Sequence, residues 1–405
     1  MNIGLFTDSY YPEINGVATS VLTLKNELEN LGHTVYVFTT TTPGAPEHEH
    51  NVFRVPSLPC IFITERRVGL FYQHKLASII KKLELDLIHT HTEFSLGIFG
   101  RIMARDLKIP MVHTYHTIYE DYTHYVTSLR VIDKRAKAFV RVFTRVCCNH
   151  VEQVIAPTEK VKELLLHYKV VKDISVVPTG VSLHKFNPDL YKQDDIDRVK
   201  KEIGMKEGEK VLLYIGRISK EKNISEIIDG MPEFMTRHDN VKFILIGGGP
   251  DEEVLKKKIA DLKLEGNIQL IGPRPWDSIG LYYQVGDVFV SASTSETQGL
   301  TFIEAMAAGL PVVARQDRCL EDILEEGYNG YTFTTKEGLI NGLESVLFGD
   351  KVPFKENSRN KVKQYSTEEF AKSIEKVYSQ VMERNDILLA REKNESKKIS
   401  HLFYP

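Results

Sequence analysis

The strongest constraint on the fold is an alternation of short apolar strands with helical stretches, which occurs twice along the chain. Each strand candidate is almost continuously apolar, as strands of parallel sheets are when helices cover both faces. The first set comprises 2–6, 34–39, 85–91, 109–116, 153–156 and 174–178. The second set comprises 211–215, 241–246, 268–271, 287–291 and 311–314. Residues 17–31 carry apolar side chains at helical spacing, so the chain is predicted to begin with a strand–helix–strand unit.

A polar stretch at 187–201 separates the two sets of strands. Each half is therefore expected to build its own doubly wound α/β sheet, one domain over 1–182 and another over 183–365. Such sheets bind ligands at the carboxyl ends of their strands, so two facing sheets would line a common cleft. A capping-box sequence, Ser-Thr-Glu-Glu, opens an amphipathic helix expected over 366–390, and 391–405 is expected to be a polar tail.

The composition argues against several classes of protein. Lysine and arginine number 52 and aspartate and glutamate 55, a formal net charge of −3, whereas a dedicated nucleic-acid binder needs a basic surplus. No apolar run approaches the roughly 18 residues of a membrane-spanning helix, and no export signal opens the sequence, so we expect a cytoplasmic protein. The four cysteines lack metal-ligand spacing and Asp195–Asp197 is typical of a solvated helix face, so no metal is expected.

The segment 291–313 is the most informative for chemistry. A strand ends in small hydroxylated residues, a loop contains Gly299, and a helix follows from about Leu300. The backbone amides of Leu300 and Thr301 would be unpaired donors at the start of this helix, which is a ready site for a phosphate group.

Two carboxylates flank this predicted phosphate site. Glu296 lies in the loop, and Glu304 lies in the first turns of the helix. Glu304 alone could simply favour the helix dipole. A pair of carboxylates is harder to explain in that way, because carboxylates accept paired hydrogen bonds from vicinal hydroxyls. One could hold a ribose diol and the other a sugar ring.

Positive charge for a diphosphate is available at 214–223. Arg217 directly follows a predicted strand, and Lys222 comes five residues later. A guanidinium and an ammonium at the carboxyl end of a strand can neutralise a departing diphosphate. The alternative is a surface turn with two solvated cations. Gly16 opens a helix after the first strand, where the missing side chain lets the backbone approach a pyrophosphate.

Four histidines end two strands of the first half. His89 and His91 end one strand, and His113 and His116 end the next. Most of this cluster is interpreted as structural, and zinc is disfavoured because no carboxylate or thiol completes a ligand set. The glycine run 247–249 lacks the Gly-x-Gly-x-x-Gly spacing, which argues against a nicotinamide oxidoreductase.

Together these segments resemble glycosyltransferase family 4, over roughly 1–385 and in the same order. The resemblance is carried by Glu296-x7-Glu304 with Gly299 between, Gly216-Arg217, Glu221-Lys222-Asn223, Asn15-Gly16-Val17 and His116. It implies the GT-B fold, in which two doubly wound Rossmann-like domains face a cleft and the C-terminal helix crosses back to the first domain. It also implies a retaining hexosyltransferase that uses a nucleotide sugar and needs no metal or other cofactor.

The resemblance also assigns roles to individual residues. The residues that it assigns to binding of the donor diphosphate are Arg217, Lys222, Gly16, Gly299, Leu300 and Thr301. Glu304 would bind the ribose hydroxyls, Glu296 the donor sugar beside the reacting carbon, and His116 the sugar near the breaking bond. Arg274 is placed at the border of the base. With no second carboxylate evident for a covalent intermediate, front-face attack by the acceptor hydroxyl is expected.

Two basic amphipathic stretches, 65–83 and 130–145, suggest contact with an anionic membrane surface, although such faces are often merely solvated. The strings HTHTEFSLG, VHTYHTIYEDYTHYV and FTDSYYPEINGVATS resemble those of bacterial diacylglycerol glucosyltransferases within the family. The expected acceptor and membrane residues are Tyr10, Arg66, Arg67, Lys81, Lys82, Lys134 and Arg135. This resemblance implies a peripheral protein on the inner face of the cell membrane.

Three functions remain open at this stage. The first is transfer of glucose from UDP-glucose to the 3-hydroxyl of 1,2-diacylglycerol, for glycolipid synthesis. The second is a family 4 enzyme whose acceptor is a soluble or polyprenyl-linked glycan. The third is a non-catalytic protein of the same fold that binds a sugar nucleotide. The basic amphipathic segments favour the first, and the joint presence of Arg217, Lys222, Glu296, Glu304 and His116 argues against the third.

Overall fold

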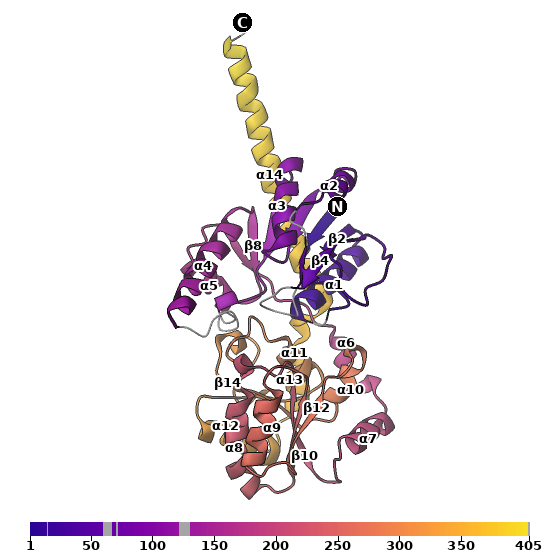
Figure 1. The fold of residues 1–405 in the computed structure, drawn as a ribbon, viewed down its shortest axis with the longest axis vertical. Helices are drawn as coiled ribbons and strands as arrows, with labels where there is room; N and C mark the ends of the chain where they lie inside the picture. The colour runs from indigo at the N-terminus through magenta and orange to yellow at the C-terminus, as the bar shows by residue number, and fades with distance from the viewer. Residues whose placement is uncertain (14, 60–66, 70–71, 121–129, 404–405) are drawn as a thin grey trace. The chain divides into compact units, whose positions relative to one another are not determined.

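A computed structural model describes residues 1–13, 15–59, 67–69, 72–120 and 130–403. The chain divides into two compact units (Figure 1). Unit 1 contains residues 1–180 together with 367–405, and unit 2 contains residues 181–366. Each unit is built on one parallel sheet with helices packed against it, so the predicted pair of doubly wound α/β domains is confirmed.

Unit 1 contains a seven-stranded sheet in the order β3-β2-β1-β6-β7-β8-β9. Its strands are β1 (Asn2–Phe6), β2 (Thr34–Thr40), β3 (Val52–Val55), β6 (Leu87–Thr90), β7 (Met111–Thr114), β8 (Gln153–Ala156) and β9 (Ile174–Val176). A small antiparallel pair joins β4 (Ser57–Pro59) to β5 (Arg67–Gly69). The helices are α1 (Gly16–Asn30), α2 (His74–Ile80), α3 (Ser95–Leu107), α4 (Arg130–Asn149), α5 (Glu159–His167) and α14 (Thr367–Phe403).

Unit 2 contains a six-stranded sheet in the order β12-β11-β10-β13-β14-β15. Its strands are β10 (Lys210–Ile215), β11 (Val241–Ile246), β12 (Ile268–Gly272), β13 (Val288–Ser291), β14 (Val312–Arg315) and β15 (Gly330–Phe333). The α-helices are α6 (Leu183–Phe186), α7 (Gln193–Glu202), α8 (Ile224–Arg237), α9 (Glu252–Asp261), α10 (Ile279–Tyr283), α11 (Leu300–Ala307), α12 (Lys336–Phe348) and α13 (Phe354–Lys361).

The central strands are apolar throughout because both of their faces are buried. In β10, Leu213 and Ile215 join one cluster of core side chains, whereas Leu212 and Tyr214 join the cluster on the opposite face. Because successive side chains of a strand point to opposite faces, a strand covered on both sides needs an unbroken apolar run.

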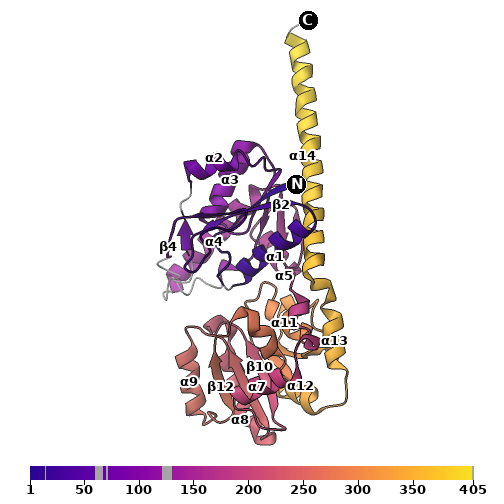
Figure 2. The same cartoon turned by 90° about the vertical axis from the view of Figure 1, so that its right-hand side faces the viewer.

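Helix α14 completes the core of unit 1. Its apolar face, predicted from the sequence, is formed by Phe370, Ile374, Val377 and Val381, and it packs in one cluster with the apolar face of α1. Figure 2 shows α14 running along unit 1 and continuing past it. Residues 391–403, expected as a polar tail, extend this helix.

Candidate active site

In unit 2, an ion pair joins two loops that carry predicted site residues. Lys222 closes a short 3₁₀ turn (Lys220–Lys222) after β10, and Glu296 lies in the loop after β13, the neighbour of β10 in the sheet. The Lys222 Nζ lies 2.5 Å from Glu296 Oε1, and both side chains are mostly buried. The structure thus brings together two residues that the sequence separates by 74 positions.

The loop that carries Arg217 is fixed by a hydrogen bond from Tyr214 and by close packing against a glycine run. The buried Tyr214 hydroxyl donates to the Arg217 carbonyl at 2.8 Å. An added Cβ at Gly247 would lie 1.8 Å from the Gly216 carbonyl oxygen, and one at Gly249 would lie 2.1 Å from that of Ile218. The glycine run therefore lets the loop after β11 pack directly on the Arg217 loop, which explains a motif that matched no dinucleotide fingerprint.

Gly299 sets the start of α11. Its φ is +75°, and an added Cβ would lie 2.4 Å from the ring of Phe302, so both the conformation and the space require glycine. Leu300 and Thr301 are the first two residues of the helix. Their N–H groups have no acceptor within the helix itself, which suits a phosphate oxygen.

Glu304 is buried in α11 and accepts a hydrogen bond from the Tyr283 hydroxyl at 2.7 Å. Burial raises the pKa of Glu304 to about 7, and the opposing effects of the Tyr283 hydrogen bond and of the Lys185 charge are smaller. Lys185 Nζ lies 3.9 Å from the centre of the Trp276 ring. Neither Tyr283 nor Lys185 belongs to a recognisable motif, so sequence reasoning missed both.

The side chain of Arg274, which is expected beside a nucleotide base, forms hydrogen bonds with other residues of unit 2. Its Nε donates to the Tyr282 hydroxyl at 3.0 Å, its Nη1 to the Ile271 carbonyl at 2.9 Å, and its Nη2 to Glu202 at 3.1 Å. It follows β12 and so lies at the carboxyl edge of the same sheet as the other predicted donor residues of unit 2. These contacts orient the loop that carries it.

In unit 1, Gly16 is the first residue of α1, and Asn15 caps that helix by accepting from the amides of Val17 and Ala18. The capping side chain also donates to Ser9 Oγ at 2.8 Å, so the loop after β1 is tied to the helix start. Tyr10 was expected on the acceptor side. Its side chain is only 1% exposed and packs in the core beside α1, so its ring supports the fold, and its contact with an acceptor stays a prediction.

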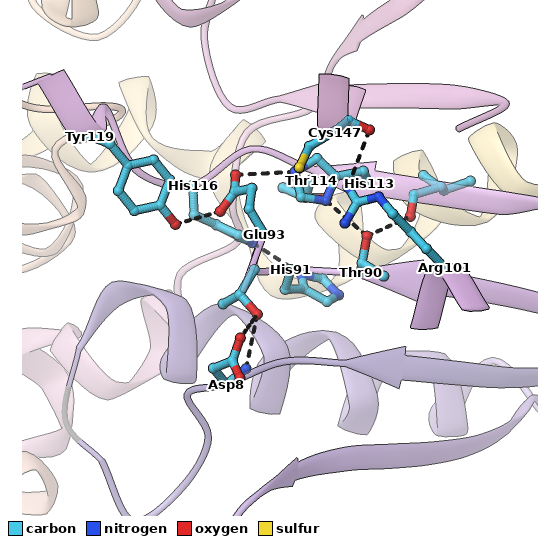
Figure 3. Close-up of polar contacts among 12 residues, drawn as sticks. Asp8, Thr90, His91, Glu93, Arg101, His113, Thr114, His116, Tyr119 and Cys147 are labelled. Carbon is cyan, nitrogen blue, oxygen red and sulfur yellow. Dashed lines mark hydrogen bonds and ion pairs between the residues drawn. The ribbon is translucent and has the colours of Figure 1, made fainter. Parts of the chain in front are cut away.

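The four histidines lie at the ends of β6 and β7 (Figure 3). His91 Nδ1 lies 3.0 Å from His116 Nε2. His113 Nε2 lies 3.2 Å from the buried Glu93 carboxylate, which also accepts from the Tyr119 hydroxyl. Burial lowers the pKa of both His89 and His91 well below the usual value, so both are neutral at pH 7. Within the described ranges, no three His, Cys, Asp or Glu side chains are grouped to hold a metal ion.

The basic segments are only partly described. Arg66 lies outside the described residues, and of Arg67 only its place in β5 is described. Lys81 Nζ pairs with Asp106 at 2.7 Å, and Lys82 is exposed beside it. Lys134 and Arg135 are exposed on α4. Of the helices in the described part of the chain, none has the length and apolar character needed to cross a membrane.

Helix α4 also exposes apolar side chains. Phe139 is 69% exposed, and Val142 and Val146 are about half exposed. Phe139 stacks on Phe143, which in turn stacks on the half-exposed Phe94. Phe139 and Phe143 thus lie on the same helix as the two exposed cations, and Phe94 joins them from the start of α3.

Comparison with known proteins covers both units. Residues 14–185 match the family model described as Glycosyltransferase Family 4, and residues 195–369 match the one described as Glycosyl transferases group 1. The chain is 37% identical to the alpha-monoglucosyldiacylglycerol synthase of Streptococcus pneumoniae, over 98% of this chain and 90% of that protein. It is 36% identical to the synthase of the same name from Acholeplasma laidlawii, over 95% and 98% respectively.

Among solved structures, the chain resembles Anabaena HepE in complex with UDP, with a TM-score of 0.74 over 94% of this chain and all of that one. At 19% identity this likeness speaks for the fold alone. The fold expected from the sequence is the one that this neighbour shares.

Proposed function

The chain belongs to glycosyltransferase family 4, and on that basis we propose that it transfers glucose from UDP-glucose to the 3-hydroxyl of 1,2-diacylglycerol, with retention of configuration. The observation that carries the choice of acceptor is the similarity, over nearly the whole chain, to two alpha-monoglucosyldiacylglycerol synthases. The geometry of unit 2 supports the choice of a nucleotide sugar as donor. Two cations, two carboxylates and a glycine-initiated helix gather at one edge of one sheet.

In this proposal the donor diphosphate is bound by Arg217, Lys222 and the first amides of α11, with the Gly16 backbone assisting. The Lys222–Glu296 pair keeps the ammonium in place before the donor arrives. A diphosphate bound there would share the ammonium with Glu296, whose carboxylate can then accept hydrogen bonds from sugar hydroxyls. Glu304 accepts from the ribose hydroxyls, and Arg274 borders the base.

The reaction breaks the bond between the sugar C1 and a β-phosphate oxygen, and the electron pair leaves with UDP. Arg217 and Lys222 stabilise the negative charge that grows on the diphosphate. The acceptor oxygen forms the new bond to C1 on the same face, and its proton passes to the departing β-phosphate oxygen. His116 is assigned to the sugar near the breaking bond. A fixed cation pair can supply the neutralisation that a divalent ion supplies in other transferases.

We place the protein at an anionic membrane surface on the cytoplasmic side, where its lipid acceptor lies. Helix α4 supports this placement, because Lys134 and Arg135 are exposed on the same helix as the apolar Phe139 and Val142. Cations can bind anionic headgroups while apolar side chains enter the interface. Lys81 and Lys82, after α2, add to the positive charge of unit 1.

The test is a transfer assay with radiolabelled UDP-glucose and diacylglycerol in mixed anionic micelles. We expect a labelled monoglucosyl lipid whose anomeric proton shows the α configuration of the donor. Label found in a polyprenyl-linked or soluble glycan, and none in diacylglycerol, would overturn the proposed acceptor. Binding of UDP-glucose without transfer to any of the three acceptors would instead identify a non-catalytic protein.

A further inference from the structure

We propose that His91 is a positioning residue that donates its Nδ1–H to His116 Nε2 and thereby fixes the tautomer and ring plane of His116. The two nitrogens lie 3.0 Å apart, and the rings are 5.3 Å apart at their centres with planes 28° apart. The two residues follow neighbouring strands, β6 and β7, and Figure 3 shows the contact. The inference rests on the proposed function only for its effect on catalysis.

His91 is held rigidly by its surroundings. It is buried, and its ring lies 4.0 Å from that of His89. His89 is fixed in turn on both sides: its Nδ1 lies 2.6 Å from the Tyr378 hydroxyl of α14, and its Nε2 lies 2.7 Å from Thr114 Oγ1. The position of the His91 ring is therefore set by the core of unit 1 rather than by solvent.

The direction of the hydrogen bond follows from the other nitrogen of His91. His91 Nε2 is buried and has no hydrogen-bond partner among the residues that the structure describes. A neutral imidazole carries one N–H, so if His91 accepted at Nδ1 its only N–H would be buried and unpaired at Nε2. Buried N–H groups without partners are rarer than acceptors left without a donor. His91 therefore donates from Nδ1, and His116 accepts at Nε2.

This hydrogen bond determines whether Nδ1 of His116 carries a proton. When Nε2 accepts, the proton of a neutral His116 lies on Nδ1, so Nδ1 is a hydrogen-bond donor. Among the described residues, titratable groups near the pair include His89 and Tyr378 on one side and His113 with Glu93 on the other. His113 contacts the Glu93 carboxylate, so Glu93 is occupied by its own partner.

The direct test is long-range proton–nitrogen NMR on protein labelled with ¹⁵N-histidine, with the His116 signals assigned from a His116→Gln sample. In the wild-type protein we expect the His116 Nδ1 shift of a protonated nitrogen and the Nε2 shift of an acceptor. His91→Leu should move the proton of His116 to Nε2. His91→Asn should restore the wild-type pattern, because the asparagine amide can donate from nearly the same position. Protonated Nε2 in the wild-type protein would overturn the proposal.

A kinetic measurement separates this proposal from the proposed function. His91→Leu should lower kcat by roughly 10- to 100-fold through loss of orientation, with KM for UDP-glucose little changed, and His91→Asn should recover most of the loss. Equal losses in both variants would reduce His91 to a packing role and overturn the proposal. A wild-type protein with the expected tautomer but no glucosyl transfer would contradict the proposed function alone. If His91→Leu fails to fold, the wild-type and His91→Asn spectra still decide the tautomer.

Discussion

The ammonium of Lys222 lies 2.5 Å from a carboxylate oxygen of Glu296, although the two residues come from loops after different strands of unit 2. An ion pair at this place has two uses. In the proposed mechanism, it holds the cation ready for the diphosphate and the carboxylate where sugar hydroxyls are to bind.

Removal of the cation tests the first use. Lys222→Ala should lower kcat by about 100- to 1,000-fold, because one fixed donor to the leaving group is lost. Steady-state kinetics with UDP-glucose measure this. Lys220→Ala, in the same short turn but with an exposed side chain, is the matched control and should keep wild-type activity. An active Lys222→Ala protein would remove Lys222 from the mechanism.

Donor affinity should depend on pH through Glu304. Because the pKa of Glu304 is raised to about 7, UDP binding should weaken as pH falls through this value and the carboxylate becomes protonated. Tyr283→Phe removes a hydrogen bond that lowers this pKa, so the loss of affinity should begin at higher pH. Calorimetric Kd values for UDP between pH 5.5 and 8.5 check this (a range of roughly 1.5 units either side of the pKa). Tyr282→Phe is the control: its hydroxyl contacts Arg274 and not Glu304, so the variant should keep the wild-type pH midpoint even where the affinity itself changes.

Glu304 should also make the folded protein less stable as pH rises. A carboxyl whose pKa rises from 4.5 unfolded to about 7 folded binds more protons in the folded state between these values. The contribution of Glu304 to the free energy of unfolding is therefore fully present below about pH 4.5. It is lost as pH rises through 7, and the loss is up to about 3 kcal/mol. Urea unfolding of wild type and Glu304→Gln at pH 5 and pH 8 measures it. An equal change in the two proteins would show that other groups cause the dependence.

Gly299 should tolerate no side chain. Gly299→Ala places a Cβ against the Phe302 ring in a left-handed conformation, so we expect a loss of more than about 2 kcal/mol of unfolding free energy and weaker UDP binding. Gly208→Ala is the matched control, because Gly208 also has a positive φ, +82°, but open space around it. Backbone strain alone should cost that variant about 1 kcal/mol. Equal losses in the two variants would contradict the steric argument.

Membrane binding should depend on the charge of α4. Lys134→Glu with Arg135→Glu should weaken binding to anionic vesicles by at least about 30-fold, since each near-surface cation contributes about 1 kcal/mol. Vesicle sedimentation at low and physiological salt measures it. Lys256→Glu with Lys257→Glu, on exposed positions of α9, makes the same change of charge elsewhere and should bind as wild type. Wild-type protein that stays in solution at both salt concentrations would exclude the proposed surface.

Much of the fold could be predicted because its central strands are buried on both faces. β3 and β15 were not predicted, and each lies at an edge of its sheet. Arg54 interrupts the apolar run of β3, and β15 is half-buried at its middle residues. Edge position alone is not the reason, because the edge strands β9 and β12 were predicted. The sequences of β3 and β15 lack the nearly unbroken apolar run that identified the other strands.

The site was predictable where it consists of residues in a fixed local spacing. Glu296, Gly299 and Glu304 lie within one loop and helix, so their spacing in the sequence is a spacing in space. Tyr283 and Lys185 reach Glu304 from α10 and α6, and only the tertiary fold brings them there. Tyr10 shows a different limit: its place in a sequence motif does not reveal that its ring lies in the core beside α1.

Because unit 1 consists of residues 1–180 and 367–405, its chain is discontinuous. The apolar stripe of α1 packs against α14, which comes after the whole of unit 2 in the chain. During synthesis the part of that stripe that α14 covers has no partner until all of unit 2 has been made. A chain that ended before Phe370 would contain every strand of both sheets and still be unable to close its first core.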